Sequence, residues 1–399
     1  MMLSVSEARA RILAGARVTG VEVVALAEAW GRVTAADLVA RVDQPPADVS
    51  AMDGYAVQHG DAGARRVVGA APAGHPFAGE LGVGEAVRLF TGSVMPVGAD
   101  CVLLQEDAVR DGEVVVPTSA TRAGGHVRRR GGDFRCGDVL IAAGVRLGAR
   151  GVGLAAAGNH GWVAVRRRPV VAILATGDEI ALPGEPIGPG GIVSSNAHAL
   201  AALVRGRGGV PVVLPIARDT SAGVAAAAGA ARGADLLVTP GGASVGEHDL
   251  VQAGLGMQGF ELDFWKIAMR PGKPLISGRL GGMPVLGLPG NPVSALVCAV
   301  LFLGPLLERL QGMAGAAPAV SAARLGAALG ATDARADHIR ATLEVGEDGG
   351  LVTTALGRQD SSMLRALHES DALIVRAPHA PALGPGDAVS VIRLDTFGF

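Results

Sequence analysis

The sequence predicts a multidomain α/β plus β protein, built around a doubly wound, mostly parallel sheet. Between residues 168 and 312, short apolar runs alternate with helix-length segments, as in a parallel sheet with helices on both faces. The run Pro169–Ala175 is apolar throughout, as expected of a strand buried on both sides. The regions on either side carry short strands punctuated by glycine and proline, which is typical of β-rich domains.

The central region is expected to contain five strands and three helices. Asn196 is a candidate N-cap of the first helix, and Gly208-Gly209 would end it. In such sheets ligands bind at the carboxyl ends of the strands, so we look for a site there. The expected strands are Pro169–Ala175, Val210–Leu214, Asp235–Thr239, Phe264–Ala268 and Val285–Leu288, and the expected helices are Ala197–Arg207, Ala222–Ala231 and Val293–Leu310.

Changes in composition along the chain predict four domains. Residues 1–45 and 136–167 form an N-terminal elongated domain, interrupted by a β-rich domain at 46–135. The α/β domain spans 168–312, and a C-terminal β-barrel-like domain spans 313–399. The strands expected in the two β domains are Arg65–Val68, Ala86–Phe90, Cys101–Leu104, Glu113–Val116, Ile339–Val345, Leu351–Thr354, Ala372–Val375 and Ala388–Arg393.

The bulk composition argues against nucleic-acid and membrane partners. A net charge of −2 gives no electrostatic footprint for either, and 3% aromatic residues leave little to stack on bases. Three widely spaced cysteines fit neither a disulfide framework nor a zinc site. The amino-terminal residues carry charges where a signal peptide needs an apolar run, and Val293–Leu307 is short for a membrane span. We therefore expect a soluble, cytoplasmic protein.

Lysine is concentrated at one place in the chain. Of 35 basic residues only Lys266 and Lys273 are lysines, which leaves 33 arginines. An ammonium is a compact point charge, whereas a guanidinium is a planar fork, so the pair suggests a site that needs an ammonium. Codon bias in a G+C-rich genome is the alternative explanation.

Three loops at strand ends have compositions that suit anion or metal binding. The first, ATGDEI, places Glu179 where a helix is expected to begin, although an acidic residue there also stabilises a helix without any ligand. The second runs from Thr239 to Leu250. Its Gly241, Gly242 and Ser244 supply N–H and hydroxyl groups that can donate hydrogen bonds to a phosphate. Asp249 supplies a carboxylate for Mg²⁺.

Glycine is common in this chain, so glycines alone are weak evidence for the second loop. The third loop holds Gly290, Asn291 and Pro292, a helix start that is either an anion site or a plain cap. Cations, acids and donors at one sheet edge predict a phosphorylated ligand, a divalent metal and phosphoanhydride chemistry.

Outside the α/β region, four further polar residues stand in turn-like segments. Asp53 lies in SAMDGYA, Thr91 and Glu106 lie in FTGSVMPVGADCVLLQED, and Asp133 follows two glycines in RRRGGD. Each taken singly is more often a turn residue than a site residue.

Taken together and in order, eight segments resemble the molybdopterin molybdenumtransferase family, which includes the E domain of gephyrin. The resemblance runs from residue 50 to about residue 296, and the tail fits more loosely. The segments are SAMDGYA, FTGSVMPVGADCVLLQED, RRRGGDF, ATGDEI, the Ser195-Asn196 pair, LLVTPGGASVGEHD, FWKIAMRPGKP and LGLPGNPVSAL.

This resemblance implies a homodimer of four-domain chains whose α/β domain is related to the enzyme that adenylates molybdopterin. The implied reaction inserts molybdate into adenylated molybdopterin with Mg²⁺, releasing AMP and molybdenum cofactor. The active site would be shared between the α/β domain of one subunit and the inserted β domain of the other. The adenylating enzyme and cofactor-receiving enzymes are the partners that the resemblance suggests.

The resemblance also assigns roles to individual residues. Asp249, Glu179 and Asp235 look like the acids around Mg²⁺ and pyrophosphate, and Lys266 like the cation near the pterin phosphate. The molybdate pocket would be formed by Arg270, Lys273, Arg335 and Ser361 or Ser362. Gly290, Asn291 and Pro292 would frame the dithiolene end, and the inserted domain would contribute Asp53, Thr91, Glu106 and Asp133.

Two departures from the family pattern stand out. Arg270 occupies a position where the family usually has lysine, and the segment around Arg335 is poorer in arginine than the family's. Three alternatives therefore stay open: a molybdopterin adenylyltransferase, a non-catalytic cofactor carrier or scaffold, and a degenerate paralogue. The choice between molybdate and tungstate is also open.

Overall fold

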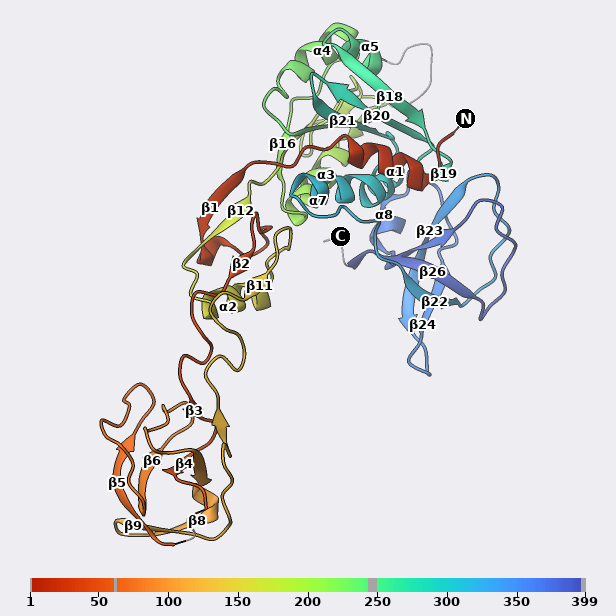
Figure 1. Cartoon of the computed structure of the whole chain (residues 1–399). Helices are drawn as coiled ribbons and strands as arrows, with labels where there is room; N and C mark the ends of the chain where they lie inside the picture. The colour runs from red at the N-terminus through yellow and green to blue at the C-terminus, as the bar shows by residue number, and fades with distance from the viewer. Residues whose placement is uncertain (1, 61–62, 243–249, 396–399) are drawn as a thin grey trace. The chain divides into compact units, whose positions relative to one another are not determined.

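The computed structural model describes residues 2–60, 63–242 and 250–395 (Figure 1). Its contacts divide the chain into two compact units. Unit 1 comprises Met1–Glu22 and Arg166–Phe399, and unit 2 comprises Val23–Val165. The ranges expected for four domains stay a prediction.

The core of unit 1 is a six-stranded sheet that confirms the predicted doubly wound, mostly parallel architecture. The strand order is β16-β13-β17-β21-β20-β18, and the first four strands are mutually parallel. Because β20 runs antiparallel to both neighbours, β18 again points the same way as β21. The strands are β13 Val170–Ile173, β16 Val210–Val213, β17 Leu236–Pro240, β18 Phe260–Lys266, β20 Pro274–Leu280 and β21 Met283–Leu288.

Helices cover both faces of this sheet because successive side chains of each strand point to opposite sides. Val171 and Ile173 pack with α1, α3, α6 and α7, whereas Ala172 and Leu174 pack with α4 and α5. Figure 1 shows these two layers around the sheet. The helices are α1 Val5–Ala14, α3 Asn196–Gly206, α4 Ser221–Gly229, α5 Leu250–Gly256, α6 Pro292–Cys298 and α7 Gly304–Leu310.

One continuous helical segment, Pro292–Leu310, forms the centre of the core. It contains α6, a π-helical turn at Ala299–Leu303 and α7. With 19 residues and a mean hydropathy of 1.9, it is long and apolar enough to cross a membrane, contrary to the expectation from Val293–Leu307. However, 89% of its apolar window is buried inside the protein, as in a core helix.

The C-terminal part of unit 1 is a closed five-stranded barrel, which confirms the barrel-like expectation. Strands pair in the order β23-β24-β22-β26-β25, and a β23–β25 pairing closes the ring. The short strand β19 (Met269–Arg270) of the α/β region pairs parallel with β23. The barrel elements are β22 Ser321–Leu325, β23 Ala336–Val345, β24 Leu351–Ala355, α8 Leu364–His368, β25 Ala372–Arg376 and β26 Ala388–Arg393.

Unit 2 contains a six-stranded sheet of its own, ordered β7-β4-β6-β5-β9-β8. Three two-stranded pairings, β1–β12, β2–β11 and β3–β10, accompany it. The sheet strands are β4 Gly54–Val57, β5 Arg65–Ala71, β6 Glu85–Leu89, β7 Cys101–Leu104, β8 Ala108–Asp111 and β9 Val114–Pro117. The remaining elements are β1 Val21–Ala25, η1 Leu26–Glu28, β2 Leu38–Val39, β3 Val49–Ser50, η2 Gln105–Asp107, β10 Val127–Arg128, β11 Val139–Ile141, α2 Ala149–Ala157 and β12 Trp162–Arg166.

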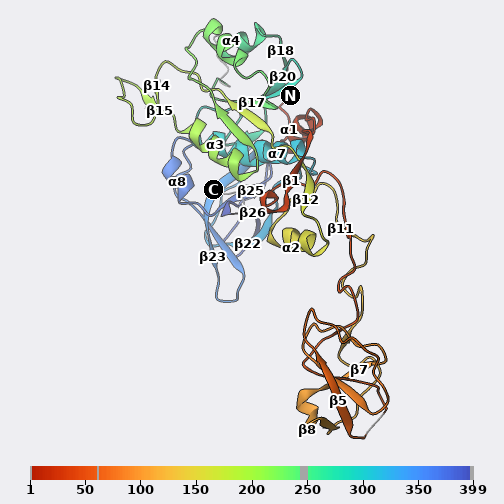
Figure 2. The same cartoon turned by 90° about the vertical axis from the view of Figure 1, so that its left-hand side faces the viewer.

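The chain after β13 differs from the expectation. ATGDEI does not open a helix. Instead it leads into two short parallel strands, β14 (Ile180–Ala181) and β15 (Ile192–Val193), which Figure 2 shows. The helix begins only at Asn196, with Ser195 as its N-cap. Glu179 therefore lies in a loop rather than on a helix terminus.

Candidate functional site

The carboxyl ends of β17 and β21 lie side by side and bring two glycine loops together. The Gly241 N–H donates to the Leu288 carbonyl at 3.0 Å. A Cβ added to Gly290 would lie 3.8 Å from the Gly241 Cα. Gly241 has φ +102°, which favours glycine. The structure thus joins Gly241, Gly242 and Gly290 at one edge of the sheet, as expected.

Two asparagines fasten this edge to neighbouring segments instead of capping helices. The Asn196 Nδ2 donates to the Gly290 carbonyl at 2.7 Å. The Asn291 Nδ2 donates to the Ser361 Oγ at 2.7 Å, and neither side chain makes a capping hydrogen bond. The Val293 N–H donates to the Ser361 carbonyl at 3.0 Å, so the barrel segment at Ser361 is tied to the start of α6.

The two candidate serines have different surroundings. Ser361 contacts Asn291, as described above. Ser362 turns to Asp360 instead: its N–H and its hydroxyl both donate to the Asp360 carboxylate, at 2.8 and 2.6 Å. These two bonds, the side-chain bond first, lower the pKa of Asp360. Only Ser361 is bonded directly to the Gly290–Pro292 loop.

Both lysines lie at this same edge. Lys266 ends β18 and pairs in register with Pro274, the residue after Lys273. The Lys266 Nζ lies 3.6 Å from the centroid of the Trp265 ring, and the Ile267 N–H donates to the Lys273 carbonyl at 3.0 Å. Among residues 2–60, 63–242 and 250–395, neither ammonium has an acidic partner.

The two arginines expected in the oxyanion pocket are close together, but acids neutralise both. The Arg270 Nε donates to Asp337 at 3.0 Å, its second nitrogen bonds the other carboxylate oxygen, and Asp333 lies 4.0 Å away. The Arg335 guanidinium bonds Asp333 at 2.6 Å and 3.2 Å. The Arg335 side-chain bond is the largest cause that lowers the pKa of Asp333, to about 2.

The loop that carries Lys273 packs tightly on α6. Gly272 has φ +109°, and an added Cβ would lie 2.5 Å from the Cys298 Sγ. Cys298 is fully buried, and this burial raises the pKa of its thiol. Only glycine fits at position 272, because both the backbone angle and the contact exclude a side chain.

Glu179 is the one described carboxylate of the expected metal set that follows a strand at this edge. It is exposed, and a Cβ added to Gly177 would lie 2.6 Å from its carboxylate. Ser244 and Asp249 lie outside the described residues. In the part of the chain that is described, three or more His, Cys, Asp or Glu residues nowhere gather in a metal-binding group.

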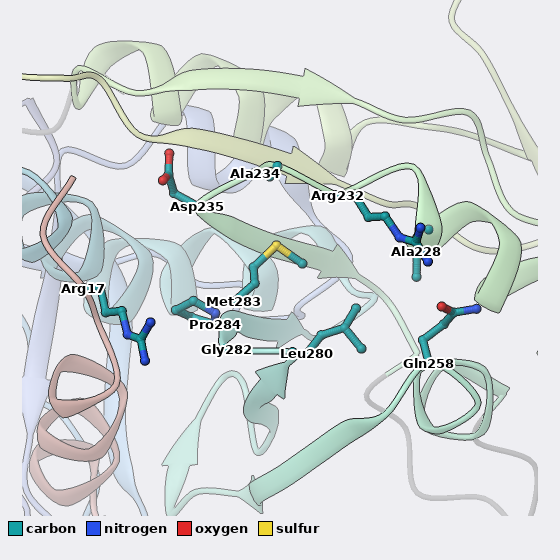
Figure 3. Close-up of a pocket in the computed structure, with 13 residues that line it drawn as sticks. Arg17, Ala228, Arg232, Ala234, Asp235, Gln258, Leu280, Gly282, Met283 and Pro284 are labelled. Carbon is teal, nitrogen blue, oxygen red and sulfur yellow. The ribbon is translucent and has the colours of Figure 1, made fainter. Parts of the chain in front are cut away.

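Asp235 does not belong to this edge, which corrects the expectation that it joins Glu179 around a metal. It precedes β17, at the amino ends of the strands. Its carboxylate accepts two bonds from Arg167, at 2.7 and 2.9 Å, and one from the Val170 N–H at 2.7 Å. Asp235, Arg17 and Met283 help to line a cavity of about 480 Å³ at the amino end of the sheet (Figure 3).

Unit 2 brings three of its four expected residues together. The Thr91 N–H and hydroxyl donate to the Asp53 carboxylate at 2.8 and 2.9 Å, and these bonds, the N–H first, lower its pKa. The Gln105 N–H donates to the Asp53 carbonyl at 3.2 Å, and its side chain donates to Glu106 at 3.2 Å. Asp133 is elsewhere in unit 2, with its N–H bonded to the Gln44 carbonyl at 2.9 Å.

Sequence reasoning missed three residues of the site. Asn196 was predicted to be a helix N-cap. Asp333 and Asp337 were not predicted as site residues, although their carboxylates neutralise Arg335 and Arg270. The strand pairing Arg270↔Asp337 explains the miss, because it joins positions that are 67 residues apart. The Ser195-Asn196 pair, already part of the resemblance, was the only available signal.

Family models match nearly the whole chain. Residues 3–158 match the MoeA N-terminal region (domain I and II), residues 172–309 a probable molybdopterin binding domain, and residues 322–394 the MoeA C-terminal region (domain IV). Proteins named molybdopterin molybdenumtransferase are similar in sequence. The one from Nostoc sp. is 34% identical over 94% of this chain and 88% of its own. The one from Haemophilus influenzae is 33% identical over 98% of both chains.

Solved structures agree with these matches. Two crystal structures of the molybdopterin biosynthesis MoeA protein from Pyrococcus horikoshii have TM-scores of 0.83 and 0.85 at 29% and 25% identity. Each comparison covers 98% of this chain and 99% of the other. The matched regions, the curated relatives and the shared fold together establish that this chain belongs to the MoeA family of molybdopterin molybdenumtransferases.

Proposed function

We propose that this chain inserts molybdate into the dithiolene of adenylated molybdopterin and releases AMP and molybdenum cofactor. The observation that carries the proposal is the carboxyl edge of the central sheet. Lys266 and Lys273 lie at this edge without an acidic partner among the described residues, and the loops of Gly241, Gly242 and Gly290 meet there, with Ser361 bonded to Asn291. Such an edge offers cations and N–H donors to an anionic ligand, at the place where α/β sheets bind ligands.

The charge balance of the edge suits the reaction. Molybdate is a dianion and the dithiolene is rich in thiolate, so fixed positive charge has to bring them together. Asp337 and Asp333 offset Arg270 and Arg335, which leaves Lys266 and Lys273 as the available cations of the described edge. Preorganised cations of this kind also stabilise charge that develops as a phosphoanhydride breaks.

We assign the two lysines to opposite ends of the ligand. Lys266, held over Trp265, would bind the phosphate end of the adenylated pterin. Lys273 and Ser361 would hold the oxyanion, beside the loop of Gly290, Asn291 and Pro292 at the dithiolene end. An oxygen of molybdate or of water would attack the anhydride, so the protein need not supply a nucleophile. Burial raises the pKa of Cys101 to about 11, which makes it a poor one.

Mg²⁺ is part of the proposal, and the edge is compatible with it. Mg²⁺ usually takes one or two protein carboxylates and completes its shell with waters and substrate phosphates. The exposed Glu179 therefore suffices as a described ligand without a larger acidic cluster, and Asp249 is the second residue proposed. When bound, the ion would neutralise charge on the anhydride oxygens.

We further propose a cytoplasmic homodimer with a shared active site, in which Asp53, Thr91, Glu106 and Asp133 of one subunit complete the α/β edge of the other. Large apolar side chains that are exposed in unit 2 of the single chain support burial in an assembly. Trp30, Trp162 and Val23 are 70%, 63% and 64% exposed in the single chain. The enzyme that adenylates molybdopterin and the enzymes that receive the cofactor are the proposed partners.

The runner-up activity, molybdopterin adenylyltransferase, is less well supported. It would need only the α/β domain, yet family models also match the regions before and after that domain. A carrier role would not need the acids at the edge.

The deciding experiment mixes purified protein with adenylated molybdopterin, Mg²⁺ and molybdate and follows AMP. The proposal expects AMP release that depends on molybdate. ATP consumption without molybdate would favour the adenylyltransferase, and binding of the molybdenum cofactor without any AMP release would favour the carrier.

A further inference from the structure

Asn196 makes a contact that its position in the helix does not explain. It is the first residue of α3, one position after the N-cap residue Ser195, so its side chain does not stand at the position that usually caps the helix. Here its Nδ2 instead donates to the carbonyl of Gly290, 94 residues further along the chain. The side chain thus joins the start of α3 to the loop after β21.

The same side chain leaves its second polar atom unsatisfied. Among the described residues, the Asn196 Oδ1 is buried and has no hydrogen-bond partner. Reversing the amide would place this oxygen against the Gly290 carbonyl, an acceptor against an acceptor, so the observed orientation is required. A buried acceptor without a donor lowers the stability of the fold. The contact to Gly290 is therefore better explained by a role in the site than by a gain in stability.

The contact belongs to a chain of three hydrogen bonds. Asn196 holds Gly290, the next residue Asn291 holds the Ser361 hydroxyl, and the Ser361 carbonyl accepts the Val293 N–H. Gly290 is exposed and has no side chain of its own to hold it in place. The other hydrogen bonds described for this loop join Asn291 to Ser361 and to its own helix α6.

We infer that Asn196 is a positioning residue that fixes the Gly290–Pro292 loop and, through Asn291, the Ser361 hydroxyl at the oxyanion end of the site. The inference rests on the proposed function. It predicts an effect on the use of molybdate, because Ser361 is the described hydroxyl at that end, and little effect on binding of the adenylated pterin.

The test compares three variants of the full-length protein. Asn196→Leu keeps the approximate shape and removes the donor, and Asn196→Gln restores an amide donor on a longer arm. His198→Ala is the matched control, because His198 is an exposed residue of the same helical turn. For each we measure KM for molybdate and kcat of AMP release, binding of adenylated molybdopterin without molybdate, and hydrogen exchange at the Val293 amide.

For Asn196→Leu we expect KM for molybdate to rise roughly tenfold, with kcat and pterin binding within about twofold of the parent protein. Exchange at Val293 accelerates, Asn196→Gln recovers part of the loss, and His198→Ala behaves as the parent. An unchanged KM with unchanged exchange overturns the inference, as do equal losses in KM, kcat and pterin binding.

Failure of the proposed function gives a different result. If the parent protein releases no AMP, the reaction assigned here is wrong. The positioning role of Asn196 is then tested by hydrogen exchange alone. Faster exchange at Val293 in Asn196→Leu than in His198→Ala supports a positioning role, and equal rates refute it. If Asn196→Leu does not fold, Asn196→Gln, whose longer arm restores the contact only in part, must still exchange faster at Val293 than His198→Ala at an unchanged melting temperature, or the inference falls.

Discussion

Arg270 and Asp337 form a two-pronged ion pair between β19 and the barrel strand β23. The Arg270 Nε lies 3.0 Å from one carboxylate oxygen, and a terminal nitrogen bonds the other. The Asp337 side chain is 5% exposed, and Arg270 supplies the opposite charge beside this buried carboxylate. The pair joins the α/β region to the barrel and, among the described residues, leaves Lys266 and Lys273 as the cations of this edge without an acidic partner.

Removing Arg270 should therefore affect stability more than molybdate affinity. In Arg270→Ala the nearly buried Asp337 carboxylate loses its partner, and we expect a loss of about 2 kcal/mol in the free energy of unfolding. Urea denaturation measures it. Arg324→Ala is the control, because the Arg324–Asp348 pair is about half exposed on both sides and should contribute less than about 1 kcal/mol. Equal losses in the two variants would show that the Arg270 pair is an ordinary surface contact.

Gly272→Ala should displace the loop that carries Lys273. The new methyl group would meet the Cys298 Sγ and would sit on a backbone with positive φ. We expect AMP release to fall by at least roughly tenfold, with a lower melting temperature. Gly282→Ala is the control, because Gly282 also has positive φ (+91°) but an added Cβ would meet nothing within 4 Å. Similar activity in both variants would mean that backbone strain, and not the contact with Cys298, explains any loss.

Burial of His338 should make stability depend on pH. This burial lowers the pKa of the imidazole to about 4, from an ordinary value of 6.5. The unfolded chain binds a proton near pH 6.5 that the folded chain accepts only near pH 4. The stabilisation from the neutral ring is therefore complete above pH 6.5 and is lost as the pH falls toward 4.

Urea midpoints between pH 7 and pH 4 test this dependence. The decrease of the urea midpoint with falling pH should become smaller in His338→Gln. It should persist in His368→Gln, because His368 is exposed. A slope that survives in His338→Gln would assign the pH dependence to other groups.

A shared active site can be tested by mixing two inactive homodimers. Asp53→Asn alters unit 2, and Lys266→Ala alters the sheet edge. If each site combines unit 2 of one subunit with the edge of the other, re-associated mixtures contain heterodimers with one intact site. Activity should then return to about a quarter of the parent value, from random pairing of two chains. A site built within one chain predicts no recovery above either variant alone.

The sequence was sufficient to predict the architecture, because its signals are local. Pro169–Ala175 is apolar without interruption, and β7 and β26 have the predicted bounds, Cys101–Leu104 and Ala388–Arg393. Strand β20 was missed since Pro274–Leu280 follows a proline- and glycine-rich stretch that resembles a loop. Its presence reverses the chain twice and places both lysines at the same edge.

The site was predicted less completely, because its contacts join distant positions. Asn196 and Asn291 stand where the sequence predicts helix starts, yet their side chains bond Gly290 and Ser361. Asp235 is acidic and adjoins a strand, but it is at the amino end, where Arg167 binds it. The expected strand Asp235–Thr239 already placed Asp235 at an amino end, but which distant residue neutralises its charge follows from the assembled sheet and not from local spacing.

The most direct test of the lysine edge is a molybdate titration of AMP release by Lys273→Ala protein, with binding of adenylated molybdopterin measured in parallel. Because Lys273 is assigned to the oxyanion end, KM for molybdate should rise by roughly tenfold or more while pterin binding changes by less than about threefold. Equal losses in molybdate use and pterin binding, or no loss in either, would contradict the account.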